Sequence, residues 1–262
     1  MSEDKLLAPC PLRAAALASP EAAAVVGERC TITFEELDRL VSKAALRLGE
    51  LEQGSRVALY LPKDELYVVL LLALIHAGHV ACPVSDRLPP QGLVPLVKRA
   101  ACSALISEDE ELLQAVGADL YKLRPGTLLE AESSSGRVEP TVIPLNRPAT
   151  IIFTSGSTGV PKAALHTFGN HYYNALGSNA NITLQPGDRW LHSLPLYHVG
   201  GLSILFRCLL AGATIALPDP GTPPGEAIAV LGATHVSLVA TQLLRLLRED
   251  VDLGGLKAVL LG

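Results

Sequence analysis

Apolar positions along the chain recur with two spacings, one typical of helices and the other of strands. After Thr33 they follow the spacing of an amphipathic helix, and Thr33 and Glu36 have the form of a capping box at its start. Short apolar runs between turn residues are typical of buried strands, and their alternation with helices indicates parallel βαβ units. The pattern predicts a helix carrying Leu37, Leu40, Val41, Ala44 and Leu48, strands over Arg56–Leu61, Val80–Val84 and Ala104–Ser107, and helices over Asp64–Ala77 and Pro89–Ala101.

A second series of strands and helices begins at Thr150. A polar, proline-bearing stretch from Ser133 to Pro148 precedes it and is the best candidate for a linker. We therefore expect an α/β fold of two stacked lobes with mostly parallel sheets, namely residues 1–132, a linker over 133–149, and a second lobe over 150–262. The second series comprises strands over Thr150–Thr154, Arg189–Leu194, Thr214–Leu217, His235–Val239 and Ala258–Leu261, and helices over Phe168–Ala180, Gly201–Leu210, Glu226–Leu231 and Thr241–Glu249.

The loop after the strand Thr150–Thr154 has a composition suited to phosphate. Glycines allow close approach of a ligand, successive N–H groups can form an anion site, and a lysine adds a compact positive charge. It is not a Walker loop, because Val160 and Pro161 separate the second glycine from the lysine. A surface linker is the alternative, but the preceding strand and the following Pro-Lys argue against it. The loop residues are Thr154, Ser155, Gly156, Ser157, Thr158, Gly159 and Lys162.

A second constellation lies between Trp190 and Ser203. A strand leads into a helix there, with His198 at the turn and Gly200 and Gly201 directly after it. A histidine at the end of a strand is most often structural. Here the glycines leave room for a ligand, and we expect the phosphate loop to lie in the same sheet, so we favour a role for His198 in a binding site.

The stretch from Thr154 to Lys162 resembles the phosphate loop of the adenylate-forming superfamily, which includes acyl-CoA synthetases, adenylation domains and luciferases. The superfamily pattern is Thr-Ser-Gly-Ser/Thr-Thr-Gly-x-Pro-Lys-Gly, and this chain departs from it only at Ala163. The resemblance implies that the loop holds the β- and γ-phosphates of ATP while a carboxylate attacks the α-phosphorus. It implies catalytic roles for His198 and Lys162, an ATP site formed by the loop residues, and ATP, Mg²⁺ and coenzyme A as substrates or ligands.

Within the superfamily, three segments resemble the 2-succinylbenzoate–CoA ligases of menaquinone biosynthesis. They are Pro161–Thr167, Leu194–Ser203 and Val236–Leu243. The resemblance implies an AMP-forming acid–thiol ligase that makes an acyl-adenylate and then a CoA thioester, with the substrate against His198, Gly200, Gly201 and Thr241. A ligase for another aromatic or aliphatic carboxylate, or a non-catalytic nucleotide-binding module, remains an alternative.

Two further residues have alternative interpretations. Thr241 begins a predicted helix, so it can serve as an N-cap, line the acyl pocket, or do both. Arg207 can meet a substrate carboxylate, but an arginine on a helix is more often solvated.

The composition of the chain indicates which classes of partner and which cellular compartment to expect. The net charge is −5 and no basic block occurs, so nothing favours nucleic acid or an anionic membrane. The five cysteines are scattered without a metal-like pair, as in a reduced cytoplasmic protein. The most apolar run, Leu66–Ala77, is shorter than the ~18–20 residues of a membrane span, and the N-terminus is unlike a signal peptide.

The chain ends at Gly262 directly after a predicted strand, before the adenine, ribose, hinge and C-terminal lysine elements of the superfamily. We therefore expect a missing C-terminal part, and an exposed strand edge favours association between copies.

Overall fold

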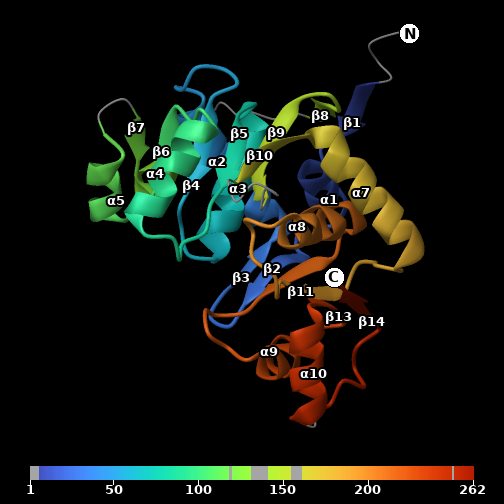
Figure 1. Cartoon of the computed structure of the whole chain (residues 1–262). Helices are drawn as coiled ribbons and strands as arrows, with labels where there is room; N and C mark the ends of the chain where they lie inside the picture. Colours follow the sequence, from blue (N-terminus) through green and yellow to red (C-terminus); the bar gives the residue numbers. More distant parts are fainter. Residues whose placement is uncertain (1–5, 118–119, 131–140, 155–160, 250) are drawn as a thin grey trace. The chain divides into compact units, whose positions relative to one another are not determined.

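The computed structural model divides the chain into two compact units and describes residues 6–117, 120–130, 141–154, 161–249 and 251–262. The first unit contains Met1–Cys10 and Arg39–Asn170, and the second contains Pro11–Asp38 and His171–Gly262. A six-stranded sheet in which parallel pairs predominate forms the centre of each unit (Figure 1). The predicted α/β fold with mostly parallel sheets is confirmed.

The elements of the first unit are β1 (Leu7–Pro9), β4 (Arg56–Leu59), α3 (Glu65–Ala77), β5 (Val80–Pro83), α4 (Pro90–Arg99), β6 (Ala104–Ile106), α5 (Glu110–Ala115), β7 (Tyr121–Leu123), α6 (Pro125–Leu129), β8 (Val142–Pro144), β9 (Pro148–Thr154) and β10 (Lys162–Thr167). The elements of the second unit are α1 (Pro11–Ala18), β2 (Ala23–Gly27), β3 (Thr31–Thr33), β11 (Arg189–Leu191), α8 (Val199–Ala211), β12 (Thr214–Leu217), α9 (Pro224–Leu231), β13 (His235–Leu238), α10 (Ala240–Arg248) and β14 (Ala258–Leu261). Helices α2 (Phe34–Leu48) and α7 (Phe168–Asn181) each cross the boundary between the two units.

The sheet of the first unit has the strand order β10-β9-β5-β4-β6-β7. All neighbouring pairs are parallel except β10 with β9. Strands β5 and β6 are buried throughout, as expected of apolar runs in a parallel sheet that is covered on both faces. Leu93 of α4 and Leu112 of α5 pack against Ala58 and Leu105 of the sheet, so these two helices cover one of its faces.

Helix α3 shows how the sequence sets the ends of an element. The Asp64 side chain accepts a hydrogen bond from the Tyr67 amide at 2.9 Å and so satisfies one of the free N–H groups of the first turn. Gly78 ends the helix in the left-handed conformation, with φ of 84°, which an L side chain rarely adopts. The apolar run between these residues is too short to cross a membrane and is buried as a core helix.

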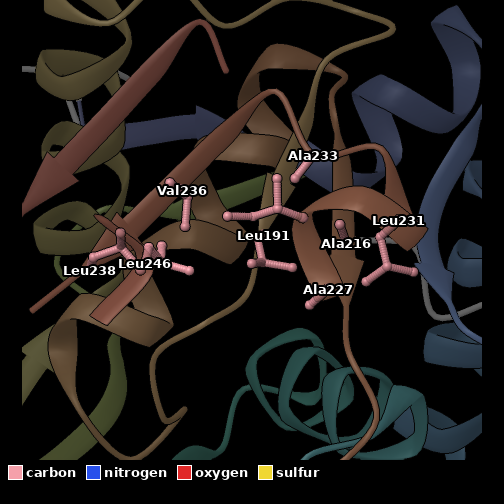
Figure 2. Close-up of a cluster of buried hydrophobic side chains, with 9 residues drawn as sticks. Leu191, Ala216, Ala227, Leu231, Ala233, Val236, Leu238 and Leu246 are labelled. Carbon is pink, nitrogen blue, oxygen red and sulfur yellow. The ribbon is translucent and has the colours of Figure 1, made fainter. Parts of the chain in front are cut away.

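The sheet of the second unit has the strand order β14-β13-β11-β12-β2-β3, and only β2 and β3 are antiparallel. Helices α9 and α10 pack on one face of this sheet. Figure 2 shows the side chains of Leu191, Val236 and Leu238 from the strands meeting Leu231 of α9 and Leu246 of α10. Helix α8, buried over most of its length, contacts β12 and α1.

The division of the chain differs from the one expected from the order of its elements. Strand β9 pairs with β5 in the first sheet, with Ala81 opposite Thr150, so the expectation that the phosphate loop shares a sheet with the later strands is wrong. In turn, β2 joins the later strands, with Val25 opposite Ile215. Part of the predicted linker is regular structure, since β8 pairs with β1.

Candidate active site

The predicted phosphate loop lies between two antiparallel strands, β9 and β10. Thr154 ends β9, Lys162 begins β10, and the two residues are directly opposite each other in the register. Both side chains are exposed. The loop itself lies outside the described residues, so the roles predicted for its members stay predictions: Ser155, Gly156, Ser157, Thr158 and Gly159.

The base of this hairpin is fixed to the sheet below it. Phe153 and Ala163, which flank the two loop ends, pack against a buried cluster that includes Cys82 and Ile151. Because β9 runs parallel to β5, Thr154 lies at the carboxyl end of a parallel strand, where open α/β sheets bind ligands. No described carboxylate forms an ion pair with Lys162, so its charge is available to an anion.

His198 is the N-cap of α8 and is exposed, as its predicted position at a strand-to-helix turn requires. Its side chain makes no capping hydrogen bond to the helix. The imidazole instead contacts the Tyr197 ring edge-on, with the ring centroids 4.7 Å apart. The first N–H groups of α8 and the imidazole therefore lie at one accessible turn, which is suited to an oxyanion or a carboxylate.

The two glycines after His198 have different structural roles. A Cβ on Gly201 would lie 2.1 Å from the Pro195 carbonyl oxygen, so the turn needs glycine there whatever ligand is bound. A Cβ on Gly200 would meet only the end of the Leu194 side chain, at 3.1 Å. Of the two predicted glycines, only Gly200 is free of a backbone constraint, and the predicted contact of either with substrate stays a prediction.

Arg207 is buried, so the interpretation of it as a solvated helix residue is wrong. Its guanidinium carbon lies 5.1 Å from the centre of the Trp190 ring, and burial lowers the pKa of the group. Its Nε has no hydrogen-bond partner among the described residues. Burial of a cation without an acid is costly, which makes Arg207 a candidate for binding an anionic ligand.

Thr241 is exposed in the first turn of α10 but is not the N-cap of that helix. The N-cap is Val239, whose amide donates to the Gln242 side chain at 3.0 Å. The capping interpretation of Thr241 is therefore wrong, and its role as pocket lining stays a prediction. Lys162 and Thr154 belong to the first unit, whereas His198, Arg207 and Thr241 belong to the second.

The described residues offer no evident place for a metal ion. Among them, no cluster of three or more histidine, cysteine, aspartate or glutamate side chains could hold one. In the same part of the chain, every helix is too short or too polar to span a bilayer.

Similar proteins found by sequence and by structure carry names of the same enzyme activity. The chain is 33% identical over 256 residues to a 2-succinylbenzoate–CoA ligase of Bacillus velezensis, a match that covers 93% of this chain and 51% of the relative. The solved structure of O-succinylbenzoate coenzyme A synthetase from Bacillus subtilis in complex with ATP and magnesium ion is also similar. It is 28% identical, with a TM-score of 0.88, over 98% of this chain and 55% of that chain.

The same Bacillus subtilis enzyme in complex with the acyl-adenylate intermediate OSB-AMP is 27% identical, with a TM-score of 0.87, over 98% of this chain and 68% of that one. The chain spans about half the length of the curated relatives it matches. The family model described as AMP-binding enzyme matches residues 12–262. Since that match spans nearly the whole sequence, the chain belongs to the AMP-binding enzyme family.

Proposed function

We propose that this chain binds ATP and a carboxylic acid for an AMP-forming acid–CoA ligase reaction, and that the acid is 2-succinylbenzoate. Family membership supports the nucleotide, and the names of similar proteins support the acid. The observation on which the proposal rests is the hairpin of β9 and β10, which presents an exposed lysine opposite an exposed threonine at the carboxyl edge of a parallel sheet.

The first step is attack of the substrate carboxylate on the α-phosphorus of ATP, which expels pyrophosphate and leaves an acyl-adenylate. Lys162 neutralises charge on the phosphate oxygens, and the Thr154 hydroxyl donates a hydrogen bond to one of them. Thr154 and Lys162 belong to paired strands, so their backbone positions are fixed before the ligand binds. Such preorganisation favours an in-line attack. Magnesium would neutralise further phosphate charge, but the described residues hold no group of metal ligands, so we assign it none.

The second step is attack of the coenzyme A thiolate on the acyl carbonyl, with AMP as the leaving group. His198 lies exposed at the start of α8 without a capping hydrogen bond, and it would orient the carboxylate or stabilise the adenylate. Arg207 would bind the carboxylate of 2-succinylbenzoate that is not activated. The support is its buried guanidinium, which has no acid partner among the described side chains.

The test is carboxylate-dependent exchange of pyrophosphate into ATP, followed by mass spectrometry for the CoA thioester, with the chain and any sequence its gene encodes after Gly262. Exchange with 2-succinylbenzoate that exceeds exchange with benzoate, acetate and octanoate supports the proposal. Turnover of another acid instead would identify a different ligase. Nucleotide binding without exchange for any acid would favour a non-catalytic module.

A further inference from the structure

Trp190 is the single tryptophan of the chain and is 1% exposed on β11. Three polar groups surround its indole. The Arg207 guanidinium lies over the ring at 5.1 Å from the centroid, and the His235 ring stacks on it at 5.3 Å with an interplanar angle of 30°. The indole N–H donates to the Ser237 hydroxyl at 3.1 Å. The Ser237 contact is what a buried indole N–H ordinarily requires, whereas the guanidinium over the ring face is an additional partner that core packing does not require.

The neighbouring strand fixes the orientation of the indole. His235 and Ser237 lie two residues apart on β13, so their side chains point to the same face of the sheet, and Trp190 is opposite His235 in the register. Both nitrogens of the His235 ring are occupied, one by the Thr234 hydroxyl at 2.8 Å and the other by the Thr183 carbonyl at 3.0 Å. The ring plane of Trp190 is thus held by a histidine that cannot turn freely.

Arg207 depends on that ring for its position. Its carbonyl accepts a hydrogen bond from Asn179, but this contact fixes the backbone and not the guanidinium. The Arg207 Nε has no partner among the described residues, and none of their carboxylates forms an ion pair with the guanidinium. Within the described part of the chain, the indole is the side chain that orients the group, and a flat aromatic face orients a planar guanidinium well.

We propose that Trp190 is a positioning residue for substrate selection: with His235 and Ser237, it holds the Arg207 guanidinium in the orientation that receives the second carboxylate of a dicarboxylic acid. The inference rests on the proposed function, because it takes Arg207 as the group that meets this carboxylate. It adds the reason why a buried arginine can distinguish a dicarboxylate from a monocarboxylate. An arginine free to change rotamer would lose that selectivity.

The test compares Trp190→Leu, Trp190→Phe and Ser237→Ala with wild type and with Val236→Ala. The control, Val236→Ala, removes buried volume from β13, the strand of Ser237. Its side chain lies on the opposite face of the sheet, in the cluster of Figure 2. Initial rates are measured with 2-succinylbenzoate and with the monocarboxylate analogue that keeps the reacting carboxylate and lacks the recognised one. Thermal midpoints are measured in parallel, so that a variant that fails to fold is recognised and the milder Ser237→Ala then decides.

We expect Trp190→Leu to raise KM for 2-succinylbenzoate about 10-fold with little change in kcat, as for loss of an aromatic partner by a desolvated guanidinium. KM for the analogue that lacks the recognised carboxylate should not change. Trp190→Phe should restore most of the affinity, because it keeps an aromatic face. Equal losses for both acids, or losses matched by Val236→Ala, would overturn the inference and leave a structural role.

A second readout separates this inference from the proposed function. Since Trp190 is the single tryptophan, its emission reports directly on the Arg207 face of the ring. Titration with 2-succinylbenzoate should change the emission of the wild type and not that of Arg207→Met. Emission that responds without any turnover would refute the ligase function alone. Turnover with unresponsive emission would refute the positioning role alone.

Discussion

Replacing Gly201 by alanine sets helix propensity against packing, and the structure predicts which effect is larger. Gly201 lies in the first turn of α8, where alanine is more favourable than glycine by about 1 kcal/mol in an unconstrained helix. However, the new Cβ would lie 2.1 Å from the Pro195 carbonyl oxygen and 2.8 Å from the Leu194 carbonyl oxygen. Both are backbone atoms, so no side-chain rotation relieves the contact.

To reach an ordinary contact of 3.4 Å, the backbone at Pro195 would have to move by about 1.3 Å. Overpacking costs roughly 1–3 kcal/mol, and we take about 3 kcal/mol here because both contacts are with backbone atoms. Subtracting the gain of about 1 kcal/mol in helix propensity leaves a net loss of about 2 kcal/mol in the free energy of unfolding. In urea, with a slope of about 2 kcal/mol per molar, the midpoint should fall by about 1 M. Trp190 fluorescence is the appropriate probe, because the tryptophan and Gly201 belong to the same unit.

Gly200→Ala is the matched control for this prediction. It makes the same change one residue earlier, but its Cβ would meet only the flexible end of Leu194, at 3.1 Å. We expect the gain in helix propensity and the cost of the tight Leu194 contact to offset each other, so that its stability stays within about 0.5 kcal/mol of wild type. If Gly201→Ala were as stable as Gly200→Ala, the packing argument for this turn would be refuted.

Three further outcomes follow from side chains outside that turn. Lys162→Ala should slow adenylate formation by about 10²–10³-fold with an unchanged thermal midpoint, whereas Lys98→Ala, also exposed, should not slow it. Near wild-type pyrophosphate exchange in Lys162→Ala would contradict the phosphate-binding role proposed for this lysine. Burial lowers the pKa of His76 to about 4, so the unfolded chain binds its proton first as pH falls. The contribution of neutral His76 to the free energy of unfolding should therefore be fully present above the unfolded pKa of about 6.5 and should fall by up to about 3 kcal/mol toward pH 4. Urea titrations at several pH values measure this decline, and His76→Gln should make it shallower. Leu246→Ala should cost about 2–5 kcal/mol because the side chain is 1% exposed, and Leu247→Ala, 63% exposed, should cost less than about 0.5 kcal/mol; equal costs would refute the assigned core.

Local signals in the sequence predicted individual elements well. The Thr33 hydroxyl accepts from the Glu36 amide at 3.2 Å, as the capping-box pattern predicted for the start of α2. Strands β12 and β14 have the predicted bounds, Thr214–Leu217 and Ala258–Leu261. These features depend on residues close together in the chain, so periodicity and cap chemistry contain the information needed to place them.

Strand order could not be predicted in the same way. Strand β9 pairs with β5 and with β10, and not with β11 or the later strands, and β2 joins those later strands in the other sheet. Such pairings depend on hydrogen bonds between segments far apart, about which the hydrophobic period of either strand says nothing. Strand β10 was missed for a local reason: Ala163 and Ala164 have low strand propensity, and the edge strand is held by its register with β9.

The residues of the candidate site also differ in whether local sequence or long-range contacts determine their surroundings. Lys162, Thr154 and His198 could be predicted as site residues because each lies in a short motif whose residue types alone suggest phosphate or carboxylate chemistry, and their roles stay predictions. The environment of Arg207 was not predicted, because its partner Trp190 lies on a different element and the residues that fix Trp190 lie on a third. A motif can therefore suggest which groups bind the reacting phosphate, which every substrate shares. The contacts that we propose for selecting the acid join elements far apart in the sequence, and only the fold shows them.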